Sequence, residues 1–108
     1  MERIAAADWM WGSYVWNMFD FGSAARNEGG VRGRNNKGLV TFDRKIKKDS
    51  FYLYKAWWSD EHFIKIAGER YLKRKIGVSE IKVYSNAAKI RLEVGGYSAE
   101  AEGAHVFK

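Results

Sequence analysis

Apolar side chains crowd the stretch SYVWNMFDF, from Ser13 to Phe21, at successive rather than alternate positions. β-Branched and aromatic residues in such a run are typical of a strand covered on both faces, as in a parallel sheet. We therefore predict a strand here, with a buried helical segment as the alternative. Just before it, Ile4 to Trp11 fits a short helix that Gly12 ends.

A helical pattern returns near the middle of the chain. Asp49 can cap a helix through SFYLYKAWW, in which Phe51, Tyr54 and Trp58 share one face. The basic run DRKIKKD that leads into this helix is most simply explained as a solvated segment.

The C-terminal half alternates apolar and polar positions. HFIKIAG predicts one strand, and EIKVYSNAAKIRLEVGG predicts an antiparallel hairpin whose turn falls at SNAA. The tail YSAEAEGAHVFK predicts one more edge strand. Strands that are apolar on one side and polar on the other indicate part of a β-sandwich.

Residues Gly22 to Gly38 form a predicted loop of 17 residues with five glycines. Loops of this length without structure of their own are usually functional or disordered. This loop follows the predicted buried strand directly, which is how many enzymes present a binding site.

Neither half is complete by these patterns. A strand with two apolar faces needs sheet neighbours and a layer on each side, whereas a sandwich of the immunoglobulin type needs about seven strands. The chain is therefore interpreted as a fragment of the α+β class, in which residues 1–58 end one domain and residues 59–108 begin another.

Composition narrows the function classes. The formal net charge is +6. Cysteine is absent, so disulfides and thiolate metal sites are excluded. His62 and His105 stand apart without ligand spacing, and we expect neither a metal nor a cofactor. No apolar run reaches the roughly 20 residues of a membrane span, and the first residues, MERIAAADW, predict no export signal. We expect no membrane partner.

Three blocks carry a resemblance to a known family. WNMFDF, RNNKGLVTFDR and KKDSFYLYKA occur in an order and spacing similar to glycoside hydrolase family 2, above all bacterial β-galactosidases. The resemblance covers essentially the whole chain. It implies that the first block is the last strand of a (β/α)8 barrel, that KKDSFYLYKAWW is the helix closing it, and that an immunoglobulin-like sandwich follows.

The resemblance also implies sugar-contacting residues. Trp16 matches the tryptophan that forms an apolar floor for the sugar ring, although a tryptophan in a buried strand is usually core. Asn35 and Lys37 match the Asn-x-Lys arrangement with which β-glucuronidases of the family hold a substrate carboxylate. The implied partner is a carbohydrate, a terminal β-galactoside or a β-glucuronide, and the parent chain would also contact this segment.

Catalytic residues are not expected in this chain. Retaining hydrolysis needs two carboxylates about 5 to 5.5 Å apart, and the resemblance implies that both glutamates lie on earlier barrel strands. Asp20 and Glu28 do not lie in the sequence motifs that hold the family's two catalytic glutamates. We expect Asp20 to hydrogen-bond the loop backbone. The chain alone is predicted to be inactive. The longer protein of which it would be a part is predicted to be a bacterial glycosidase, periplasmic or cytoplasmic. A homo-oligomer is compatible with these patterns.

Two other functions stay open from the residues alone. Net charge and the arginine- and glycine-rich loop would suit a small basic module that binds nucleic acid. However, the aromatic residues after the basic run follow the pattern of a helix core. We therefore expect no nucleic-acid partner. A non-catalytic carbohydrate-binding domain could use Trp16 and Lys37 without chemistry.

Overall fold

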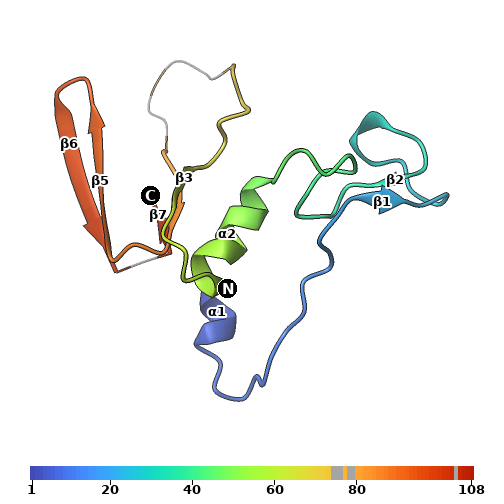
Figure 1. Cartoon of the computed structure of the whole chain (residues 1–108), viewed down its shortest axis with the longest axis horizontal. Coiled ribbons are helices and arrows are strands. Elements are labelled where there is room, and N and C mark those ends of the chain that lie inside the picture. The colour runs from blue at the N-terminus through green and yellow to red at the C-terminus, as the bar shows by residue number, and fades with distance from the viewer. Residues whose placement is uncertain (74–76, 78–79, 104) are drawn as a thin grey trace. The chain divides into compact units, whose positions relative to one another are not determined.

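The computed structural model describes residues 1–73, 77, 80–103 and 105–108, and it has an α+β architecture with short strands and few helices, as predicted (Figure 1). The chain divides into two compact units, Met1–Phe51 and Tyr52–Lys108. Each unit buries its own apolar residues: Leu39 and Val40 in the first, and Ala56, Val83, Tyr84 and Phe107 in the second. In the described part of the chain, no helix is long and apolar enough to cross a membrane.

The first unit begins with helix α1, Glu2–Ala5, which has only four residues. The predicted helix as far as Trp11 is therefore wrong. None of the residues of α1 is buried, and no side chain caps its first turn. A helix of this length has little intrinsic stability in water, and Trp9 and Trp11, which should have extended it, are 81% and 88% exposed.

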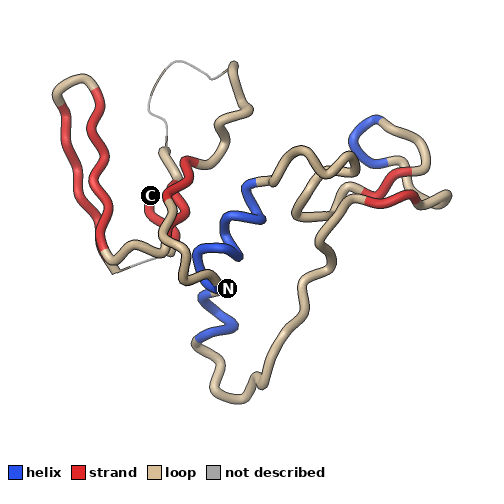
Figure 2. Tube along the Cα trace, viewed as in Figure 1, coloured by secondary structure: helices blue, strands red, loops and turns tan. Residues whose placement is uncertain are grey.

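The predicted strand from Ser13 to Phe21 is also wrong in extent. Only Phe21–Gly22 forms strand β1, and the segment before it is an extended loop, drawn in tan in Figure 2. Tyr14 and Trp16 are 88% and 74% exposed. An apolar strand needs sheet neighbours for its backbone and a layer for each face, and the described residues of this unit provide neighbours only near β1.

The loop from Gly22 to Gly38 is folded back on its own starting point. Its residues Arg34–Asn35 form strand β2, which pairs antiparallel with β1, and Glu28–Gly30 form a 3₁₀ turn, η1, between them. β1 and β2 lie side by side in Figure 1. The loop that was expected to lack structure is therefore closed by a short ladder.

A second backbone pairing joins the residues just before β1 to the residues that follow β2. Phe19 and Val40 form a parallel bridge: the amide of Val40 donates to the Met18 carbonyl at 2.9 Å, and the amide of Asp20 donates to the Val40 carbonyl at 2.9 Å. This pairing brings Gly38 against the backbone of Phe19 and Asp20 so closely that no side chain fits between them.

Helix α2, Asp49–Trp58, forms as predicted. Its apolar face differs from the predicted stripe, because Ala56 is the buried residue of the helix and Trp58 is 60% exposed. Within the second unit, Tyr52 lies against Phe63 with ring centroids 6.2 Å apart, and Trp57 lies against His105 at 4.3 Å. These contacts join the helix to the strand region that follows it.

The second unit has a sheet of three described strands and a separate hairpin. The sheet has the order β3-β4-β7 with antiparallel pairs, and the hairpin pairs β5 with β6. The strands are β3 Ile64–Ile66, β4 Val83–Ser85, β5 Lys89–Val94, β6 Tyr97–Glu102 and β7 Val106–Phe107. Apolar side chains of both, among them Val83, Ile90 and Leu92, line one cavity of about 110 Å³.

The predicted hairpin across SNAA is wrong, although both of its arms are strands. β4 already has β3 on one side and β7 on the other, so β5 cannot pair with it. Instead β5 turns into β6 through Gly95 and Gly96, whose φ values of 53° and 85° suit the two-residue turns of hairpins. The tail accordingly supplies two strands rather than one.

Polar side chains of the SNAA segment explain its path. Ser85 is fully buried, and its hydroxyl donates to the Phe63 carbonyl at 2.7 Å. The amide nitrogen of Asn86 donates to the carbonyls of Ser59 and Glu61 at 2.8 and 3.0 Å. These hydrogen bonds attach the end of β4 and the residue after it to the segment that follows α2.

In the first unit, a turn from Thr41 to Ile46 follows the parallel bridge. The Asp43 carboxylate accepts a hydrogen bond from the Thr41 hydroxyl at 2.6 Å and one from the Lys45 amide at 3.1 Å. These two bonds lower the pKa of Asp43, because they favour its charged form.

We expect Gly38→Ala to lower the free energy of unfolding by about 1–3 kcal/mol, the usual cost of overpacking. A Cβ at this position would lie 2.2 Å from the Asp20 nitrogen and 2.2 Å from the Phe19 carbonyl carbon, both backbone atoms. Gly12→Ala is the matched control, since nothing lies within 4 Å of a Cβ there. Urea unfolding followed by tryptophan fluorescence measures both variants, and equal stabilities would contradict the close approach.

We expect Thr41→Val to raise the pKa of Asp43 toward its ordinary value of 3.8, because the largest cause of its lowering is lost. In the wild type, the turn gains stability from Asp43 above the ordinary pKa, and this gain disappears as the pH falls through the lowered pKa. Carboxyl ¹³C shifts recorded against pH measure the change. Thr41→Ser retains the hydroxyl and should retain the low pKa; an unchanged pKa in Thr41→Val would refute the assignment.

Candidate functional site

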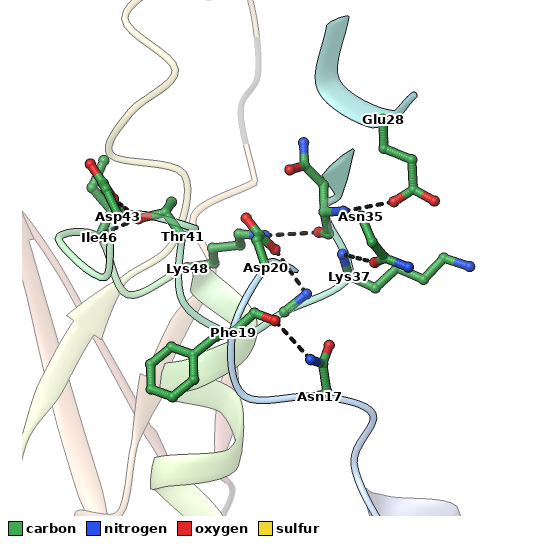
Figure 3. Close-up of polar contacts among 12 residues, drawn as sticks. Asn17, Phe19, Asp20, Glu28, Asn35, Lys37, Thr41, Asp43, Ile46 and Lys48 are labelled. Carbon is green, nitrogen blue, oxygen red and sulfur yellow. Dashed lines mark hydrogen bonds and ion pairs between the residues drawn. The ribbon is translucent and has the colours of Figure 1, made fainter. Parts of the chain in front are cut away.

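Asp20 lies at the centre of the polar contacts in the first unit (Figure 3). It is 6% exposed, and its Oδ1 accepts the amide hydrogen of Gly38 at 2.9 Å. The carboxylate thus connects the residue just before β1 to the end of the long loop. The predicted role of Asp20, a hydrogen bond to the loop backbone, is confirmed.

Lys48 is the counter-charge of Asp20. Its Nζ lies 2.6 Å from Asp20 Oδ1, and the same ammonium donates to the Asn36 carbonyl at 2.8 Å. The side chains of Lys48 and Asp20 are 20% and 4% exposed, so the pair is largely withdrawn from water. The prediction of a purely solvated basic run from Asp43 to Asp49 is therefore wrong at Lys48.

Asn35 and Lys37, predicted from the Asn-x-Lys arrangement, have different environments. Asn35 is 5% exposed, and its Oδ1 accepts the backbone amide of Lys37 at 2.9 Å. The Lys37 side chain is exposed and extends away from Asp20 and Lys48 in Figure 3. Its Nζ has no hydrogen-bond or ion-pair partner among the residues that the structure describes.

Glu28 supports the same loop from its other side. Its Oε2 accepts the Asn36 amide at 2.8 Å, and Oε1 lies 3.7 Å from the Arg26 guanidinium. Gly29, with a φ of 63°, leaves room for the Asn36 side chain, whose nitrogen lies 2.0 Å from where a Cβ would be. Both carboxylates that the sequence offered, Asp20 and Glu28, are thus engaged with loop backbone.

Trp16 lies on the extended segment before this network. Its ring meets the edge of Phe21, with centroids 6.1 Å apart and planes at 89°, and its peptide bond to Asn17 is cis. Phe21 is the backbone partner of Asn35 in the β1–β2 ladder. Trp16, Asn35 and Lys37 are therefore linked through neighbouring contacts, and the exposed ring of Trp16 is not a core residue of this unit.

Lys48 was not among the residues predicted for the site. Five other basic or acidic residues share the run DRKIKKD with it, and composition alone does not distinguish its three lysines. A signal was nevertheless present, because Asp20 stands in an apolar run and a buried carboxylate needs a cationic partner. In the described residues, no three side chains of histidine, aspartate or glutamate gather as metal ligands.

Comparison with known proteins identifies the relatives of this chain. No family model matches it. A β-glucuronidase of Bacteroides fragilis is 44% identical over 105 residues, which cover 96% of this chain and 15% of that protein.

Two solved structures match as well. An FMN-binding β-glucuronidase of Faecalibacterium prausnitzii L2-6 has a TM-score of 0.84 and 53% identity, over 92% of this chain and 16% of its own. A Bacteroides fragilis protein provisionally named a β-galactosidase has a TM-score of 0.70 and 42% identity, over 78% of this chain and 12% of its own. The chain is homologous to a segment of bacterial glycosidases, which confirms the resemblance to such enzymes, and it spans about a sixth or less of their length.

We expect Lys48→Met to lower the free energy of unfolding by about 3–5 kcal/mol, because it leaves the Asp20 carboxylate buried without its counter-charge. Lys45→Met is the matched control: Lys45 is exposed and belongs to the same basic run, so its loss should change stability by less than about 0.5 kcal/mol. Urea unfolding measures both. Equal effects in the two variants would show that the Asp20–Lys48 pair contributes nothing specific.

Proposed function

We propose that this chain is part of a longer retaining glycosidase and supplies sugar-contacting side chains to its pocket. The observation that carries the proposal is the exposed ammonium of Lys37, which stands on a loop whose backbone is tied down on both sides. The homology to bacterial glycosidases supports it.

The proposal assigns residues 1–58 to the end of a (β/α)8 barrel and residues 59–108 to the beginning of an immunoglobulin-like sandwich. Binding residues of such barrels lie where strands end, and the loop with Asn35 and Lys37 follows β1 directly. The facing apolar sides of the β3-β4-β7 sheet and the β5–β6 hairpin are compatible with a sandwich.

The substrate class that fits Lys37 best is a terminal β-glucuronide. Its sugar carries a carboxylate, which an ammonium binds by charge-assisted hydrogen bonds. The Asn35 amide nitrogen would add a donor, since its oxygen is occupied by the Lys37 amide. The exposed Trp16 ring would lie under the sugar as an apolar floor. Relatives named β-glucuronidases support this choice.

A terminal β-galactoside is the second candidate. The Bacteroides fragilis structure provisionally named a β-galactosidase supports it, at 42% identity. A galactoside has a neutral hydroxymethyl group in place of the carboxylate, so Lys37 would contribute little to its affinity.

The 108-residue chain by itself is proposed to be inactive. Retaining hydrolysis needs two free carboxylates at a separation of about 5 to 5.5 Å. Asp20 is paired with Lys48 and Glu28 with loop backbone, so neither fits that role.

We expect Lys37→Ala, in the longer glycosidase, to lower kcat/KM for 4-nitrophenyl β-glucuronide by about 10- to 100-fold, the range for a lost charge-assisted hydrogen bond. The value for 4-nitrophenyl β-galactoside should stay within about twofold. Lys45→Met serves as the control for a lost surface charge. If the galactoside were the better substrate and Lys37→Ala changed neither value, the glucuronide assignment would be wrong.

A further inference from the structure

Both peptide groups that flank the Lys37 side chain are held by other side chains. In the peptide before it, the Asn36 carbonyl accepts from Lys48 Nζ at 2.8 Å and the Lys37 amide donates to Asn35 Oδ1 at 2.9 Å. In the peptide after it, the Gly38 amide donates to Asp20 Oδ1 at 2.9 Å. The backbone from which Lys37 projects therefore has little freedom to rotate.

Two of these three hydrogen bonds are made by the members of one ion pair, Asp20 and Lys48. Lys48 Nζ and Asp20 Oδ1 are 2.6 Å apart, so the carbonyl before Lys37 and the amide after it are fixed by groups that also fix each other. The pair takes its members from distant parts of the chain, just before β1 and just before α2. It is withdrawn from water, with Asp20 nearly inaccessible, which strengthens the contacts that it makes.

The ion pair also leaves the charge of Lys37 available. Lys48 is neutralised by Asp20 and directed at a carbonyl, so it does not compete for an anionic ligand. Lys37 points away from the pair, with its ammonium exposed (Figure 3). A lysine side chain loses much rotamer freedom on binding. Because the backbone of Lys37 is already fixed, only the side chain has to be ordered, and the entropy cost of binding is smaller.

We propose that Asp20 and Lys48 are positioning residues, which set the backbone of Lys37 so that its ammonium meets the carboxylate of a β-glucuronide. This inference rests on the proposed function, because it needs Lys37 to contact the substrate. It adds a specificity role for two residues that do not themselves touch the sugar.

The test is a double-mutant cycle in the longer glycosidase. Lys48→Met is measured in the wild-type background and in the Lys37→Ala background, with 4-nitrophenyl β-glucuronide and with its uncharged methyl ester. We expect Lys48→Met to raise KM for the glucuronide about tenfold in the wild-type background, and to change it less than twofold when Lys37 is already alanine. KM for the methyl ester should stay within twofold in both backgrounds.

Two further variants keep the test decisive. Lys48→Arg retains the cation and should restore most of the affinity for the glucuronide. Asp20→Asn retains an oxygen for the Gly38 amide but removes the charge, so it should raise KM by a smaller factor. It replaces Lys48→Met in the cycle if circular dichroism shows that the methionine variant is unfolded.

The outcomes separate the two proposals. If Lys37→Ala leaves KM for the glucuronide unchanged, the substrate assignment fails, and the positioning role fails with it. If Lys37→Ala raises KM but Lys48→Met acts equally in both backgrounds and on both substrates, the proposed function stands. The ion pair is then only structural, and the positioning inference is overturned.

Discussion

A single buried carboxylate organises the first half of this chain. Asp20 is almost inaccessible to water, and a charge in that environment must be paired and hydrogen-bonded. Lys48 and the Gly38 amide meet this requirement, and by doing so they bring together three segments that are distant in sequence. The close contact at Gly38 and the parallel bridge between Phe19 and Val40 adjoin this arrangement.

The loop between β1 and β2 shows how a glycine-rich segment can be ordered without a core. Its carboxylate and amide side chains bond to loop backbone, as Glu28 does with the Asn36 amide and Asn35 with the Lys37 amide. Such bonds replace the sheet ladder that a longer strand would have provided. The consequence is a backbone held by side-chain bonds on both sides of Lys37, whose cation is exposed just after β2.

Exposed aromatic side chains distinguish the extended segment before β1 from this ordered loop. Trp9, Trp11, Tyr14 and Trp16 are each more than 70% exposed. Large apolar surfaces of this kind usually mark interaction sites. In the longer glycosidase that we propose, neighbouring barrel strands would cover the apolar positions of this segment, and the sugar would use the ring of Trp16.

The sequence by itself was enough to predict helix α2, strands β3, β4 and β5, and the resemblance to glycosidases. These depend on residues close in sequence or on motifs. Tertiary structure decided the rest. The strand predicted at Ser13–Phe21 is observed only as β1. Hydrophobic periodicity and strand propensity do not by themselves provide the neighbouring strands that a longer strand needs. β5 paired with β6 because both edges of β4 were occupied. Among the lysines of DRKIKKD, Lys48 belongs to the site because its ammonium reaches the buried carboxylate of Asp20.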